Sequence, residues 1–221
     1  MRKIQVGNSK IHIPKIINGL TSEEVNVKKA YNNIKPDVVA MQVSEAELDG
    51  LKKITEGEEF EYFMTNYEQI YAKKLADFGE VKIPPPCYES AMKLCLRDEI
   101  PVEPIDMDDL YYADVFCENV STRDLIRHSL RVKKLRKKRF KVETAEEFVL
   151  AWDKEINRLK GFRNLETARE QYMARELVRL SKKYNRILCI MELQRSEGVI
   201  KKLVEKGKEG EEKRIGTYHL L

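Results

Sequence analysis

Residues 169–198 read REQYMARELVRLSKKYNRILCIMELQRSEG and join a helical pattern to a strand pattern. In the first half, apolar residues recur at helical spacing, at Met173, Leu177, Leu180 and Tyr184. This spacing is typical of a helix that buries one side. Arg169 lies on the same side, four residues before Met173. Because a buried cation needs a partner, we expect Arg169 to be largely buried and paired with Glu89 or Asp106.

The second half of this stretch predicts a buried strand that ends beside polar residues. Residues 187–191 are all apolar, and Glu192, Arg195 and Glu197 follow before a turn marked by Gly198. A similar unit lies near the start of the chain, where the apolar run 38–41 stops at Gln42. In open α/β sheets, ligands bind at the carboxyl ends of the strands. We therefore expect both strand ends to contribute to a site. We also expect the strands that end at Gln42, Asp106 and Met191 to be neighbours in one sheet, with their carboxyl ends on the same edge.

Strand patterns alternate with helix patterns on both sides of a block that is helical throughout. Strands are predicted at 2–6, 10–17, 38–41, 102–105, 187–191 and 213–221, the last after a loop at 207–212. Helices are predicted at 21–34, 44–54, 58–78, 87–97, 108–117, 121–136, 143–159 and 165–184. This order favours an α/β fold with a largely parallel sheet flanked by helices. We expect residues from about 107–165 to form a helical insertion over one face of that sheet.

Short motifs in the same order resemble one known family. They are residues 34–42 (IKPDVVAMQ), residues 168–174 (AREQYMA) and the strand and turn at 187–200, with a proline run at 84–86 and the segment 102–106 between them. Together they resemble the TraB/PrgY family, which is related to the Tiki and ChaN-like groups. The resemblance spans most of residues 16–205.

The resemblance implies a metal-dependent hydrolase with a Gly-x-x-His motif near each end and a glutamate after the first Pro-Asp strand. This chain departs at all three places. Lys10 or Ser22 stands three residues after the glycine that would open the first motif, and Gln42 replaces the glutamate. Glu192 and Arg195 replace the glycine and histidine of the last motif. We therefore expect a degenerate active site and no zinc-dependent hydrolysis.

Length and composition indicate a single domain over residues 1–221 that buries one substantial core. The longest apolar runs have five or six residues, far short of the ~20 that span a bilayer, and the first residues lack a signal-like segment. We expect a cytoplasmic protein without a membrane partner. Charged residues make up 35% of the chain, yet the net charge is only +4. Such dense, balanced charge is typical of thermophilic proteins, which suggests an archaeal or thermophilic source.

Six residues are candidates for a ligand site at the strand ends: Gln42, Glu89, Asp106, Arg169, Glu192 and Arg195. An amide such as Gln42 can bind a ligand but is neither a general base nor a good metal ligand, and it can equally cap the next helix. Arg169 can bind an anion through its planar guanidinium or hold a buried ion pair. The spacing of the candidate carboxylates does not identify a metal site, and no histidine lies near them in the sequence. We therefore expect neither a metal ion nor a cofactor.

A dense basic run covers residues 127–141 and includes Arg131, Lys133, Lys134, Lys137 and Lys138. Clustered lysine and arginine attract nucleic acid and other polyanions. Only Phe140 offers an aromatic ring for stacking on bases. The run can also be a solvated helix end, neutralised by the glutamates that follow. We expect at most weak, sequence-independent binding to nucleic acid.

Three functions remain open from the sequence. The first is a TraB-like domain that has lost its catalytic residues and acts in binding or regulation, through a protein partner, self-association or a ligand. The second is a hydrolase of altered chemistry that uses Glu89, Asp106, Arg169, Glu192 and Arg195. The third is polyanion binding through residues 127–141. The side chains that meet at the carboxyl ends of the strands decide between the first two.

Overall fold

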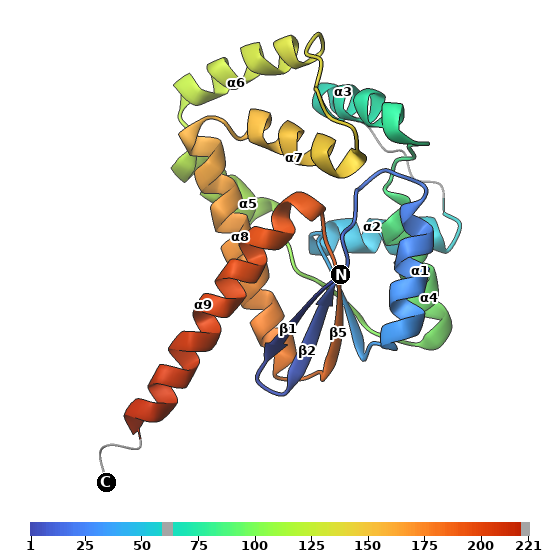
Figure 1. The fold of residues 1–221 in the computed structure, drawn as a ribbon, viewed down its shortest axis with the longest axis vertical. Helices are drawn as coiled ribbons and strands as arrows, with labels where there is room; N and C mark the ends of the chain where they lie inside the picture. Colours follow the sequence, from blue (N-terminus) through green and yellow to red (C-terminus); the bar gives the residue numbers. More distant parts are fainter. Residues whose placement is uncertain (59–63, 218–221) are drawn as a thin grey trace.

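A computed structural model describes residues 1–58 and 64–217, with side chains described as far as residue 205. Within these ranges the chain forms an α/β fold with one five-stranded sheet (Figure 1). The strands, in the spatial order β1-β2-β5-β3-β4, are Arg2–Val6, Ser9–Ile13, Arg186–Ile190, Val38–Met41 and Val102–Pro104. The expected fold class is therefore confirmed.

Three parallel strands end at the same edge of the sheet. β3 pairs in parallel with β5 and with β4, so that Met41 lies between Ile190 and Pro104. β2 is also parallel to β5, and only β1 is antiparallel to its neighbour. The prediction that the strands before Gln42, Asp106 and Glu192 are neighbours is thus confirmed. This carboxyl edge carries the candidate site.

Helices cover both faces of the sheet because the strands are apolar on both sides. One face packs on α1 (Glu23–Ile34) and α4 (Pro86–Asp98), with part of α2 (Glu45–Thr55). The other packs on α8 (Lys160–Ser181) and α9 (Leu193–Thr217). Alternate strand residues therefore enter different cores, and all four residues of β3 are buried.

The remaining helices gather beyond the carboxyl edge. They are α3 (Asn66–Leu75), the short 3₁₀ helix η1 (Ala76–Phe78), α5 (Asp109–Asn119), α6 (Thr122–Leu135) and α7 (Ala145–Ile156). In Figure 1, α3, α6 and α7 lie beyond the end of the sheet from which α9 starts. α3 and α7 share an aromatic core with η1, whereas α5 packs on α8. The insertion was expected over a face of the sheet and instead covers its end, because other helices already occupy both faces.

Two local predictions near the C-terminus are wrong. The expected turn at Glu192–Gly198 is the start of α9, since helix begins directly after the strand at Leu193. The expected loop at 207–212 and the start of the expected strand at 213–221 are helical, because α9 continues to Thr217. Residues 218–221 lie outside the described residues. A glycine inside a helix costs only about 1 kcal/mol relative to alanine, which lysine and glutamate neighbours can offset.

The predicted helix at 58–78 is shorter than expected where it can be compared. α3 begins at Asn66 because Thr65 caps it, and Thr65 and Glu68 form a reciprocal capping box. Residues 59–63 of that prediction lie outside the described residues.

Gly198 has a packing role within α9. A Cβ atom at this position would overlap the carboxylate of Glu170 on α8. Glycine therefore lets a charged side chain of one helix lie directly against the backbone of the other. Among the described residues, no helix is both long and apolar enough to cross a membrane.

Candidate functional site

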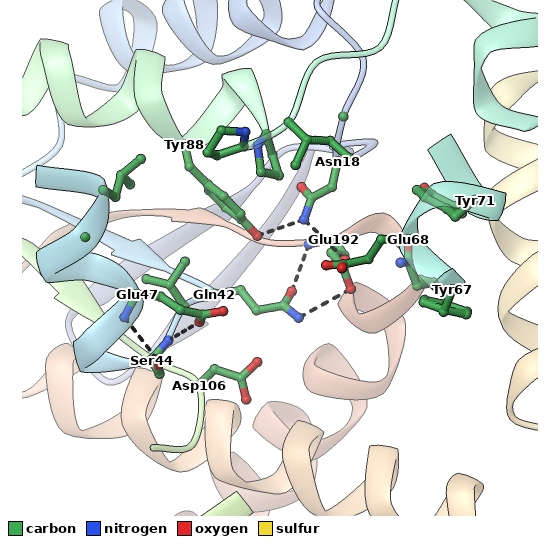
Figure 2. Close-up of a pocket in the computed structure, with 18 of the residues that line it drawn as sticks. Asn18, Gln42, Ser44, Glu47, Tyr67, Glu68, Tyr71, Tyr88, Asp106 and Glu192 are labelled. Atoms are coloured by element: carbon green, nitrogen blue, oxygen red, sulfur yellow. Dashed lines mark hydrogen bonds between the residues drawn. The ribbon is translucent and has the colours of Figure 1, made fainter. Parts of the chain in front are cut away.

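A cavity of about 680 Å³ opens at the carboxyl edge of the sheet. Its floor comes from residues that follow β3, β4 and β5, namely Gln42, Asp106 and Glu192. One side is formed by α2 and the start of α4, and the other by α3 and α7. The close-up in Figure 2 shows Glu192 near the middle of this cavity, between Gln42 and Asn18.

Glu192 is held by amides. Its backbone N–H donates to Oε1 of Gln42 at 2.9 Å, and Nε2 of Gln42 lies 3.5 Å from Oε2 of Glu192 (Figure 2). Nδ2 of Asn18 donates to the other carboxylate oxygen at 3.2 Å. Asn18 also donates to the hydroxyl of Tyr88 at 3.0 Å. These contacts fix the direction in which the carboxylate points.

Asp106 and Arg169 form an ion pair at the edge of the cavity. Nη2 of Arg169 contacts Oδ2 of Asp106 at 2.5 Å, and Nε contacts Oδ1 at 3.3 Å. Nη1 of Arg169 donates to Glu166, three residues earlier on α8, at 3.1 Å. The side chains of Arg169 and Asp106 are 22% and 8% exposed. The expected pairing of Arg169 with Asp106 is thus confirmed.

Arg195 lies behind the cavity at the start of α9. It pairs with Glu166 and Glu170 of α8, each at 3.2 Å, and with Asp153 of α7. Its side chain is only 5% exposed. Because Glu166 contacts both arginines, Arg169 and Arg195 belong to one ion-pair network that joins α7, α8 and α9. Arg195 therefore supports the site and is not among the residues that line the cavity.

Aromatic side chains form much of the remaining cavity wall: Tyr67, Tyr71, Tyr88 and Trp152. The indole Nε1 of Trp152 donates to the hydroxyl of Tyr67 at 2.7 Å, which orients both rings. Tyr71 packs beside Trp152, with ring centroids 5.6 Å apart. Tyr67 and Tyr71 come from α3, Trp152 from α7 and Tyr88 from α4.

Burial changes the titration of the carboxylates around the site. It raises the pKa of Glu192 above its ordinary value, and Glu166 and Asp106 raise it further, although Arg169 and Arg195 oppose the shift. Burial also raises the pKa of Asp153 and of Glu170. For Arg169, burial lowers the pKa, but Glu166 and Asp106 more than offset this effect and keep it above the ordinary value. Arg195 is likewise kept above its ordinary pKa, because Glu166 and Asp153 more than offset its burial. The carboxylates are thus costly to ionise, whereas Arg169 and Arg195 stay charged.

The six candidate residues are only partly brought together. Gln42, Asp106, Arg169 and Glu192 line the cavity, and Arg195 lies behind it. Glu89 is elsewhere, because its carboxylate pairs with Lys82 and Lys93 on the outer side of α4. These two lysines lower the pKa of Glu89, mainly through the hydrogen bond from Lys93. The expectation that Glu89 joins the site or pairs with Arg169 is wrong.

Several residues of the site were not identified from the sequence: Asn18, Tyr67, Tyr71, Tyr88, Trp152, Asp153 and Glu166. One of them carried a signal. Glu166 precedes Arg169 by three residues, a spacing that places the two side chains next to each other on a helix. Asn18 and the aromatic residues carried none, because they come together only through the tertiary fold.

The basic run is divided between paired and free cations. Arg131 and Lys138 both contact Glu155 of α7, at 3.4 and 2.6 Å. Lys133, Lys134 and Lys137 are exposed and have no ion pair among the described residues. α6 also exposes Ile126 and Leu130.

Comparison of the sequence with protein-family models and with curated proteins gives no match. In the described part of the chain, no group of three or more histidine, cysteine, aspartate or glutamate residues is placed to hold a metal ion.

Proposed function

We propose that this chain is a non-catalytic binding or regulatory domain that takes up a small molecule in the cavity at the carboxyl edge of its sheet. The observation that carries the proposal is the cavity of about 680 Å³ around the amide-held carboxylate of Glu192. Small-molecule sites commonly are concave, with apolar walls and a few fixed polar groups, and in α/β sheets they lie at the strand ends.

The polar groups of the floor are positioned rather than mobile. Gln42 uses both atoms of its amide on Glu192, and Arg169 is engaged by Asp106 and Glu166. A rigid arrangement of this kind lowers the cost of ordering side chains when a ligand binds.

A distant relationship to the TraB/PrgY family is part of the proposal. It is supported by the positions that the motifs single out, since Gln42, Arg169 and Glu192 line one cavity and Arg195 supports it. Replacement of the family's glutamate by Gln42 favours binding over catalysis, because an amide cannot act as a general acid or base near neutral pH.

Saturation-transfer NMR with a mixture of small amines, alcohols, carboxylic acids and sugars tests the proposal. Ala46 lines the cavity at the start of α2, and its neighbour Glu45 is exposed and does not line it. Ala46→Trp is therefore expected to abolish the transfer to any bound compound, while Glu45→Trp leaves it unchanged. Absence of binding, or binding that Ala46→Trp leaves intact, would contradict the proposal. The same spectra detect conversion of a compound, which would instead support a hydrolase or another enzyme.

Polyanion binding is the second candidate, and free lysines in and just after the last turn of α6 favour it. Lys133, Lys134 and Lys137 are exposed close together in sequence, without carboxylate partners among the described residues. Arg131 and Lys138 are engaged by Glu155, so the attraction rests on the other cations of the run. Besides the three lysines, these are Arg127, Arg136, Arg139 and Lys141, which are also exposed and have no ion pair among the described residues.

A further inference from the structure

The cavity that the proposed function assigns to a small molecule has a strongly negative lining. Six carboxylates line it, and one guanidinium is its only cationic lining group among the described residues. The carboxylates belong to Glu47, Glu68, Asp106, Asp109, Asp153 and Glu192. The guanidinium, that of Arg169, is already matched by Asp106 and Glu166. A cavity with such a field attracts cations and repels anions.

Glu192 is a floor carboxylate that neutral amides hold and no cation among the described residues contacts directly. Its oxygens accept hydrogen bonds from the neutral amides of Asn18 and Gln42, and it forms no ion pair with any described residue. The other partly buried carboxylates near it, Asp106 and Asp153, each contact an arginine. Burial of an ionised carboxylate without a cation is costly, and a ligand that carries a positive charge removes that cost.

The walls around Glu192 suit an organic cation rather than a bare metal ion. Tyr67, Tyr71, Tyr88 and Trp152 supply aromatic surface on more than one side of the cavity. Aromatic faces attract ammonium groups and cover the apolar body of an amine. A hard metal ion instead requires several oxygen ligands together, and no such group occurs among the described residues.

We infer that the occupant of the cavity is a small organic amine, bound with its ammonium group against Glu192 and its apolar part against the aromatic walls. This inference rests on the proposed function and specifies its ligand class. The amides of Gln42 and Asn18 are positioning groups, since they fix the carboxylate that receives the cation.

Two sets of probes with matched shapes and different charges test the inference by isothermal calorimetry. The aromatic set is 2-phenylethylamine, 2-phenylethanol and phenylacetate, and the aliphatic set is butylamine, butanol and butyrate. In each set the amine is expected to bind about tenfold or more tightly than the alcohol, and the acid is expected to bind most weakly. Magnesium chloride alone is the control for a simple divalent-cation site.

Variants identify the group that selects for charge. Glu192→Gln keeps the shape of the side chain and is expected to abolish the preference for amine over alcohol. Glu197→Gln, which removes an exposed carboxylate on the same helix, is the matched control and is expected to retain it. Tyr71→Leu provides a second variant that keeps Glu192, and it should weaken the aromatic amine more than the aliphatic one.

The outcomes separate the inference from the function on which it rests. If alcohols or acids bind as tightly as the amines, and Ala46→Trp blocks their binding, the result would contradict an amine as the ligand but would still support small-molecule binding in the cavity. Binding of magnesium in the cavity that is lost in Glu192→Gln would contradict an amine ligand and support a metal ion instead. If no probe of either set binds, both the amine and the binding function are contradicted.

Discussion

Gln42 and Glu192, 150 residues apart in sequence, contact each other through a reciprocal pair of polar groups. The amide oxygen of Gln42 accepts from the backbone N–H of Glu192, and its nitrogen faces the Glu192 carboxylate. A glutamate at position 42 would place a second carboxylate against Glu192 and could not donate to it. The amide at this position therefore makes Glu192 the central acidic group of the cavity.

The raised pKa of Glu192 predicts how stability depends on pH. Because the folded protein holds the Glu192 proton more tightly than the unfolded chain does, this group favours folding at low pH. That contribution is lost as pH rises from the pKa of a glutamate in the unfolded chain, about 4.3, through the pKa of Glu192 in the folded protein. Each unit of difference between these two pKa values corresponds to about 1.4 kcal/mol. Glu192→Gln cannot ionise, so its stability relative to the parent protein should increase from pH 4.5 to pH 8. Urea denaturation at several pH values measures this difference.

Asp37→Asn is the control with the opposite sign. A hydrogen bond from Arg186 lowers the pKa of Asp37, so its contribution to stability is present at neutral pH and is lost as pH falls through the folded pKa. The variant should therefore be less stable than the parent at pH 7 and nearly equal to it at low pH. If the stability of Glu192→Gln relative to the parent fell with rising pH, as that of Asp37→Asn should, Glu192 would not have a raised pKa.

Removal of the Arg169 cation should destabilise the fold through the carboxylates that it leaves behind. Arg169→Met leaves Asp106 without an ion pair among the described residues and Glu166 with Arg195 alone, and we expect a loss of about 2–4 kcal/mol in the free energy of unfolding. Combination with Asp106→Leu should cost less than the sum of the two single changes, with a coupling of about 1–3 kcal/mol. Arg175→Met, an exposed arginine on the same helix, is the control and should change stability by less than about 0.5 kcal/mol. Equal effects of the two arginine variants in chemical denaturation would show that the pair is not a buried one.

Gly198→Ala should destabilise the protein even though alanine favours helices. The added methyl group overlaps the carboxylate of Glu170, which is bound to Arg195 and cannot move freely. In a Glu170→Ala background this conflict is absent, and Gly198→Ala should become neutral or stabilising by up to about 1 kcal/mol. Thermal and urea denaturation of the four proteins of this cycle measure the change of sign. A cost for Gly198→Ala that persists without Glu170 would place the constraint elsewhere.

Binding of the basic run to nucleic acid is predicted to be weak and sensitive to salt. If between three and seven phosphates are neutralised, the logarithm of the association constant should fall with the logarithm of salt concentration with a slope of about −2 to −6. Single- and double-stranded DNA and RNA should bind without sequence preference, because only Phe140 can stack on bases.

Fluorescence anisotropy of labelled oligonucleotides at low and near-physiological salt measures this interaction. Exchange of Lys133, Lys134 and Lys137 for glutamate should weaken it strongly. Exchange of three exposed lysines on α1 and α2, Lys29, Lys52 and Lys53, should have a smaller effect. Tight binding that survives the higher salt would instead make nucleic acid the main partner.

The strands of the sheet could be predicted because a short apolar run that ends at a polar residue marks a buried strand, and this pattern is visible within a few residues of sequence. The strand ends at Gln42, Asp106 and Glu192 were located in this way, and their adjacency followed from parallel topology. The ion pair of Arg169 with Asp106 could also be predicted, since helical spacing placed the arginine on the buried side of its helix.

What the sequence could not predict depends on contacts between distant segments. Glu89 is one turn into α4 and looked equivalent to Asp106, but nearby lysines hold it on the outer surface. The aromatic wall needs α3 and α7 to meet over the carboxyl edge, and no local pattern specifies where an insertion packs. Gly198 was misread as a turn because a glycine required by close packing looks the same in sequence as one required by a bend.

Trp152 offers the most direct test of the cavity as a binding site, because it is the chain's only tryptophan and lines the cavity. Its indole N–H gives a single signal in a ¹H–¹⁵N spectrum. On titration with 2-phenylethylamine, we predict a saturating shift of this signal in the parent protein that is lost or greatly weakened in Glu192→Gln. An indole signal that stays in place throughout the titration, or that shifts equally in Glu192→Gln, would contradict the account.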